Sequence, residues 1–83
     1  MRWWAKIKIE DRICSDVTLS ADSFEEALFA SCEHFDLTKP IVTGKHEAEM
    51  QSFFRTVFYP DDFVEECTFD TFEIEKINVK KRK

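Results

Sequence analysis

WWAKIKIEDRICSDVTL, residues 3–19, alternates apolar and polar side chains on either side of a short polar break at residues 10–12. Successive side chains of a strand point to opposite faces, so this pattern predicts two half-buried strands, over 3–9 and 13–19, joined as a hairpin. With a three-residue loop, one face of this hairpin pairs Ile9 with Ile13, Ala5 with Val17 and Trp3 with Leu19. The other face then pairs Trp4 with Thr18, Lys6 with Asp16 and Lys8 with Cys14, a register in which apolar meets apolar and opposite charges meet.

A helix is predicted after the hairpin. Ser23-Phe24-Glu25-Glu26 is typical of a capping box, with Asp22 and Glu25 as an alternative one, and acidic residues in the first turn suit the helix dipole. Apolar or small side chains recur at helical spacing and should face the sheet: Phe24, Leu28, Ser31 or Cys32, and Phe35. The pattern ends after Leu37, and Pro40 disfavours helix just before it.

Residues 41–59 fit two interpretations. Met50, Phe53, Phe54, Val57 and Phe58 have helical spacing, whereas residues 53–59 have the composition of a strand that Pro60 would end. We favour a short helix or turn over 46–51 followed by a strand over 53–59, because a long apolar and aromatic run suits a central strand.

The remaining residues predict a helical turn and a last strand. Pro60 to Glu66 indicates one helical turn with Phe63 and Val64 tucked beneath it. Residues 69–77 indicate a strand whose apolar members are Phe69, Phe72, Ile74 and Ile77. These positions do not follow one strict alternation, and a bulge near Glu75 would explain the break. The order ββαββ predicts a small two-layer α+β domain over 1–79, with an antiparallel sheet of about four strands and one main helix on one face. Residues 80–83 are expected to be a disordered basic tail.

Composition narrows the class of protein. The three cysteines are odd in number and widely spaced, which favours reduced thiols in a cytoplasmic protein over a disulfide framework. Apolar runs are four residues or fewer, so we expect no transmembrane helix, and the N-terminus lacks the features of a signal peptide.

No residue pattern predicts catalysis, a metal or a cofactor. Cys32 falls on the buried helix face, Cys14 on the outer sheet face has no histidine placed beside it, and Cys67 adjoins acids that disfavour a thiolate. His34 and His46 lie twelve positions apart without partners at ligand spacing, and His46 is expected in a loop. One glycine cannot build a phosphate loop, and the paired carboxylates indicate solvated surface, so we expect a non-enzyme.

Charge is distributed unevenly and suggests two candidate binding surfaces. Residues 22–75 carry three positive and fourteen negative side chains, a net of −11, whereas residues 76–83 carry five positive and none negative. The first surface is the outer sheet face with Trp4, Lys6, Lys8 and Asp16. The second is an acidic surface that could imitate phosphates in a basic groove: Asp61, Asp62, Glu65, Glu66, Asp70, Glu73 and Glu75.

Part of the chain also resembles known families. In residues 3–36, Trp-Ala-x-Ile followed by Val-x-Leu-x-Ala-Asp-Ser-Phe-Glu-Glu-Ala-Leu is similar to the ββα opening of HicB-type antitoxins and of small phage inhibitors of host RNA polymerase. This resemblance implies only that small partner-binding proteins use such a start, and it transfers no functional residue.

Our first hypothesis is therefore a non-enzymatic protein-interaction module, for example an inhibitor or accessory factor of phage or mobile-element type. Its partner would be a protein, such as a basic nucleic-acid-binding protein, and homodimerisation through the sheet face is a subcase. The alternative is a single-stranded nucleic-acid binder that uses Trp4, Lys6, Lys8 and the basic tail, which the acidic body of the domain disfavours.

Overall fold

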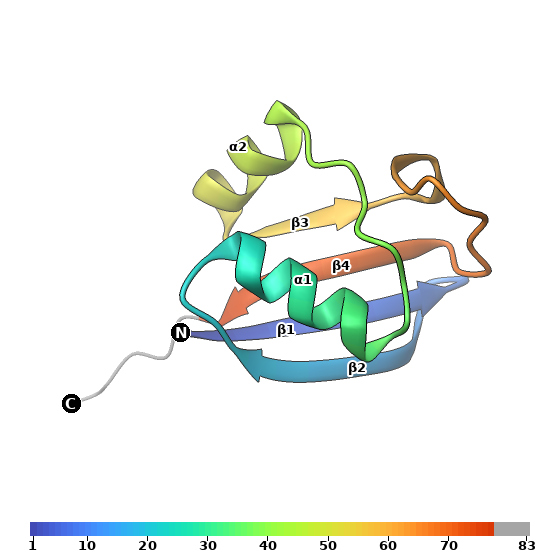
Figure 1. Cartoon of the computed structure of the whole chain (residues 1–83), viewed down its shortest axis with the longest axis horizontal. Helices are drawn as coiled ribbons and strands as arrows, with labels where there is room; N and C mark the ends of the chain where they lie inside the picture. Colours follow the sequence, from blue (N-terminus) through green and yellow to red (C-terminus); the bar gives the residue numbers. More distant parts are fainter. Residues whose placement is uncertain (78–83) are drawn as a thin grey trace.

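A computed structural model describes residues 1–77 of the chain (Figure 1), so the predicted tail lies outside the described residues. Four strands form one antiparallel sheet in the order β2-β1-β4-β3, and two helices accompany it. The elements are β1 (Arg2–Ile9), β2 (Arg12–Ser20), α1 (Phe24–His34), α2 (Gly44–Phe53), β3 (Arg55–Phe58), the 3₁₀ turn η1 (Pro60–Asp62) and β4 (Thr71–Ile77). The predicted α+β class with an antiparallel sheet of about four strands is confirmed.

The predicted β1–β2 hairpin is confirmed, but its loop is shorter than expected. The register pairs Trp3 with Leu19 and Ala5 with Val17, as predicted, and it shifts at a bulge between Ile7 and Lys8. Beyond the bulge, Lys8 faces Ile13 and Ile9 faces Arg12, so the predicted Lys8–Cys14 and Ile9–Ile13 pairs are wrong. Only two loop residues remain, Glu10 and Asp11, with φ of 53° and 67°, as a type I′ hairpin turn requires.

One face of the sheet and both helices enclose the core. Buried side chains from the strands include Trp3, Ala5, Phe58, Phe72 and Ile74, and those from the helices include Ala27, Leu28, Cys32 and Met50. Several aromatic rings meet here, with ring centroids of Phe58 and Phe72 6.1 Å apart. Aromatic burial of this kind supplies the apolar area that a chain of this length needs.

Helix α1 begins and ends with the local contacts that such helices use. Ser23 Oγ accepts from the backbone N–H of Glu26 at 3.2 Å, and the Glu26 carboxylate accepts from the N–H of Asp22 at 2.9 Å. At the other end, Asp36 has φ of 60° and the N–H of Leu37 donates to the carbonyl of Cys32 at 2.8 Å, which is a Schellman ending.

The segment between α1 and β3 differs from the prediction. Helix α2 runs from Gly44 to Phe53, longer than the predicted 46–51, and β3 covers only residues 55–58 of the predicted strand over 53–59. The change occurs at Phe54, which adopts the left-handed conformation with φ of 60° and ψ of 24°. This conformation is normally left to glycine, and here the Phe54 carbonyl accepts from the N–H of Lys76 at 2.7 Å.

The segment leading into β4 and β4 itself differ from the prediction in several details. Phe63 is buried as predicted, but Val64 is 76% exposed, and the helical turn is limited to η1. The register of β4 against β1 runs from Thr71 to Ile77 without a shift, so the predicted bulge near Glu75 is wrong. Alternation then places Ile77 on the opposite face from Phe72 and Ile74. Phe69 is buried but precedes the strand.

Within residues 1–77, neither helix is long and apolar enough to cross a membrane.

Candidate functional site

The sheet face opposite the helices, called the open face below, carries the predicted sheet-face residues. Alternation along β1 turns Arg2, Trp4, Lys6 and Lys8 away from the core. The registers bring Asp16 of β2 and Glu73 of β4 to either side of Lys6, and Thr18 and Glu75 to either side of Trp4. Arg55 and Val57 of β3 complete the face. None of the helices in the described part of the chain covers it.

Glu73 is the centre of an ion-pair network on this face. Its carboxylate lies 3.1 Å from Lys8 Nζ, 3.5 Å from an Arg55 guanidinium nitrogen and 3.6 Å from Lys6 Nζ. Lys6 Nζ also donates to Glu75 at 3.0 Å. Glu73 and Lys6 are only 4% and 5% exposed, because neighbouring side chains cover them. Charges this sheltered from water interact more strongly than charges on an ordinary surface.

Two contacts orient the Trp4 indole on the open face. Its indole Nε1 donates to Asp16 Oδ2 at 2.8 Å, and Lys6 Nζ lies 3.9 Å from the ring centroid. A hydrogen bond at the edge and a cation over the face fix the ring orientation. The predicted group of Trp4, Lys6, Lys8 and Asp16 is therefore one contiguous cluster.

The two predicted surfaces overlap in space. Glu73 and Glu75, expected on a separate acidic surface, lie on the open face beside Lys6 and Lys8. Strand β4 lies between β1 and β3, which the sequence pattern did not reveal. The charges of the open face therefore compensate each other, and the face is neither a basic nor an acidic patch.

Most of the other predicted acids make contacts within the domain. Asp70 accepts from the N–H of Glu10 at 2.7 Å and supports the hairpin turn, and Asp62 accepts from the N–H of Tyr59 at 2.9 Å. The Glu65 carboxylate accepts from the hydroxyl of Thr38. Asp61 and Glu66 are exposed and have no such contact among residues 1–77. Four of these five acids are nevertheless exposed, and Asp62 is half-buried, so they remain on the surface, whereas Glu73 and Glu75 lie on the open face.

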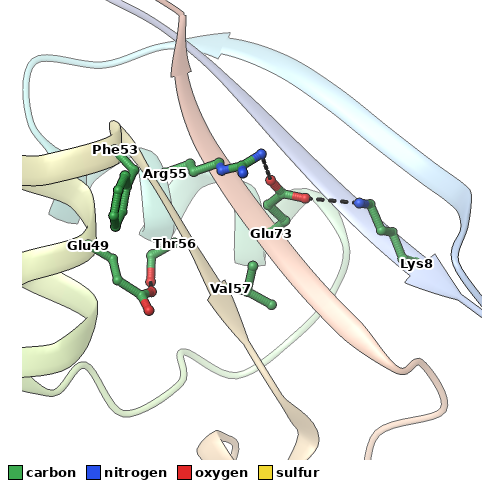
Figure 2. Close-up of a pocket in the computed structure, with 7 residues that line it drawn as sticks. All are labelled: Lys8, Glu49, Phe53, Arg55, Thr56, Val57 and Glu73. Atoms are coloured by element: carbon green, nitrogen blue, oxygen red, sulfur yellow. Dashed lines mark hydrogen bonds and ion pairs between the residues drawn. The ribbon is translucent and has the colours of Figure 1, made fainter.

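A groove of about 420 Å³ borders the network at the β3 edge (Figure 2). Its lining residues come from four elements: Lys8, Glu49, Phe53, Arg55, Thr56, Val57 and Glu73. The Thr56 hydroxyl donates to Glu49 at 2.6 Å, which joins α2 to β3 beneath the groove. Phe53 is 67% exposed, so this edge offers an aromatic side chain next to paired charges.

His46 is buried in α2 instead of lying in a loop as expected. Its Nδ1 accepts from the N–H of Thr43 at 3.0 Å, Nε2 lies 3.5 Å from Asp62, and the ring stacks on Phe58 at 4.2 Å between centroids. Sequence reasoning missed this because His takes the position that Glu or Gln holds in a capping box, although Thr43 was a visible helix-start signal. These contacts give His46 a structural role, because they join α2 to η1 and β3.

The three cysteines are free. Burial raises the pKa of the Cys32 thiol to about 11, with Lys39 opposing the shift, and it raises the pKa of Cys67, where Glu65 acts in the same direction. Cys14 is exposed. Within the described part of the chain, no three His, Cys, Asp or Glu side chains converge as metal ligands would.

No model of a known protein family matches the chain, and neither a curated protein nor a solved structure shows significant similarity to it.

Proposed function

We propose that this chain is a non-enzymatic protein-interaction module whose partner docks on the open face. The observation that supports the proposal is the Glu73 network with its fixed Trp4. A partner that meets this face finds an aromatic ring and paired charges already in place, and pre-organisation lowers the entropy lost on binding. Tryptophan and arginine are also the side chains that most often carry binding energy at protein interfaces.

The pairing of charges favours a protein partner over a nucleic acid. Lys6 and Lys8, the cations that would contact phosphates, are engaged with Glu73, and Lys6 also with Glu75. Lys6 lies over the Trp4 ring, where a stacked base would have to lie. A polyanion would need to break these contacts, whereas a protein surface can meet an electrically balanced face without doing so.

A reducing, cytoplasmic location is part of the proposal. Its support is the presence of three free cysteines, one buried in the core and one exposed on β2.

The test is capture of partners from a cell lysate by three immobilised proteins: the wild type, Trp4→Ala and Phe29→Ala. Phe29 is an exposed aromatic residue on α1, away from the open face, so the Phe29→Ala variant controls for non-specific binding by exposed aromatic side chains. We expect a partner that the wild type and Phe29→Ala retain and Trp4→Ala loses. Thermal unfolding of all three proteins verifies that they are folded. Equal capture by Trp4→Ala would remove the open face from the proposal.

Two direct measurements separate the remaining forms of binding. Sedimentation velocity over a range of concentrations tests homodimerisation through the open face, which Trp4→Ala should then abolish. Fluorescence anisotropy with a labelled oligothymidylate at low salt tests the nucleic-acid alternative, because phosphate contacts are strongest there. A shift that Lys8→Ala reduces would favour nucleic-acid binding, and an unchanged signal at tens of micromolar would discard it.

A further inference from the structure

A second surface lies on the helix side of the sheet, between the start of α1 and the flank of α2. It consists of two adjoining hollows of about 450 and 340 Å³, which share the side chains of Ser23, Phe24, Met50 and Gln51. We call these hollows together the interhelix groove. Each is within the range of about 300–1,000 Å³ that is usual for binding pockets.

The floor of the interhelix groove is apolar. Trp3 and Met50 are buried beneath it, Phe24 is half-buried, and Phe54 is 46% exposed at one end. The ring centroids of Trp3 and Phe24 lie 6.3 Å apart, so the floor is continuous from β1 to α1. Met1, also at this end, is 61% exposed. Methionine and aromatic side chains form adaptable surfaces for apolar side chains of a partner.

The rim of the groove is acidic, and no basic side chain among residues 1–77 pairs with its carboxylates. Asp22, Glu25 and Glu47 are all exposed, and their carboxylates make no ion pair or hydrogen bond within residues 1–77. Lys76, the one cation among the described residues that line the groove, lies against the Phe54 ring with Nζ 5.5 Å from its centroid. This differs from the open face, where Glu73 meets three cations.

We propose that the interhelix groove binds a basic segment of a partner protein that carries bulky apolar side chains. The apolar side chains would fill the hollows over Phe24, Met50 and Phe54, and lysines or arginines would pair with Asp22, Glu25 and Glu47. An apolar floor with an acidic rim is complementary to a basic amphipathic segment, and it repels nucleic acid. Trp3 faces this groove and Trp4 faces the open face, so the site is distinct from the one in the proposed function.

The probe is a short amphipathic peptide made only of leucine and lysine and labelled with fluorescein. Two control peptides keep the same pattern, one with glutamate in place of lysine and one with serine in place of leucine. We expect the leucine–lysine peptide to bind, the other two to bind far more weakly, and the affinity to fall as salt is added.

The position of the peptide is read from the methyl resonances of the methionines. The chain has two methionines, Met1 and Met50, and both line the interhelix groove. Labelling the methionine methyl carbons therefore gives NMR signals that report on this groove. We expect both signals to shift when the leucine–lysine peptide is added, in wild type and in Trp4→Ala alike.

Matched variants test each part of the groove. Glu25→Lys and Glu47→Lys should each weaken peptide binding by about tenfold, whereas Glu33→Lys, the same change at an exposed position near the end of α1, should leave it unchanged. Phe54→Gly removes the ring from the floor and suits the left-handed backbone there, so it should weaken binding without loss of folding.

Several results would overturn the proposal. Binding of the peptide without methyl shifts would place it elsewhere, and equal affinity for the glutamate peptide would show non-specific adhesion. Methyl shifts that appear on raising the protein concentration alone would assign the groove to a second copy of the chain. Methyl shifts on removal of residues 80–83 would assign it to the chain's own basic end. In contrast, loss of partner capture by Trp4→Ala with intact peptide binding is the result expected if the two sites are separate.

Discussion

Lys6 and Trp4, two positions apart on β1, are in cation–π contact, with Lys6 Nζ 3.9 Å from the centroid of the Trp4 ring. The same ammonium group pairs with Glu75 and Glu73. The nearly buried Lys6 therefore connects Trp4 to the carboxylates of β4. A substitution at Lys6 should affect both Trp4 and these carboxylates.

Lys6→Met and Glu73→Leu should each destabilise the domain by about 3 kcal/mol, because each leaves a nearly buried charge short of a partner. The double variant should lose much less than the sum, because an apolar pair avoids the desolvation cost. Urea unfolding of the four proteins measures this. Glu66→Gln, at an exposed acid, is the control and should change little. Additive losses would mean that the two residues do not interact energetically.

The hairpin turn should be improvable. Glu10 and Asp11 both have positive φ, a conformation in which Asn-Gly is favoured. Glu10→Asn combined with Asp11→Gly should therefore stabilise the domain by about 1 kcal/mol and raise its melting temperature. The N–H at position 10 still donates to Asp70, so Asp70→Ala should cost about 1 kcal/mol in either background. An unchanged melting temperature in the double variant would contradict the turn geometry.

Gly44 is the chain's single glycine, and it occupies the first position of α2, where no left-handed conformation is needed. A Cβ added there would meet nothing within 4 Å. Gly44→Ala should therefore stabilise the domain by about 0.5–1 kcal/mol, through the lower entropy of the unfolded chain. The reverse change at an exposed site of the same helix, Ala48→Gly, should destabilise it by about 1 kcal/mol. Thermal unfolding compares the two, and effects of equal sign would refute the argument.

Stability should fall in alkaline solution because of Cys32. Desolvation raises the pKa of this thiol from 9.0 to about 11 in the folded protein. As the pH rises, the thiol therefore loses its proton in the unfolded chain before it does so in the folded protein. The stability that the neutral Cys32 thiol contributes is fully present below pH 9 and is lost as the pH rises to about 11. The loss is on the order of 2 kcal/mol. Cys32→Ala should remove this component from the pH profile of urea unfolding, and identical profiles for both proteins would contradict it.

Local patterns predicted much of the fold. The β1–β2 pairs from Trp3 to Lys6 follow from alternation along two adjacent strands, and the start of α1 follows from Ser23 and Glu26. The length of the hairpin loop could not be predicted from the sequence, because Glu10-Asp11 lacks the Asn-Gly signature of a two-residue turn. Phe54 was equally hidden, because a bulky residue in the left-handed region carries no sequence signal for a helix end.

The candidate site depended on contacts between distant residues. Lys6 and Glu75 are 69 positions apart, and only the insertion of β4 beside β1 brings them together. The alternation along β1 therefore placed Trp4, Lys6 and Lys8 together on one face, but the sequence assigned the carboxylates of β4 to a different surface. The interhelix groove was hidden for the same reason, since its lining combines β1, α1 and α2.

The strand order has a consequence for how the domain comes into being in a cell. Strand β4 is the only link between the β1–β2 hairpin and β3 within the sheet, and it is the last of the described strands to be made. A ribosome releases the chain from its first residue onward, so the earlier strands emerge with their pairing edges and apolar faces uncovered. The four-stranded sheet can form completely only after residue 77 has left the ribosomal exit tunnel. Slowing translation should therefore not help this domain to fold, and nascent chains that end before β4 should depend on chaperones.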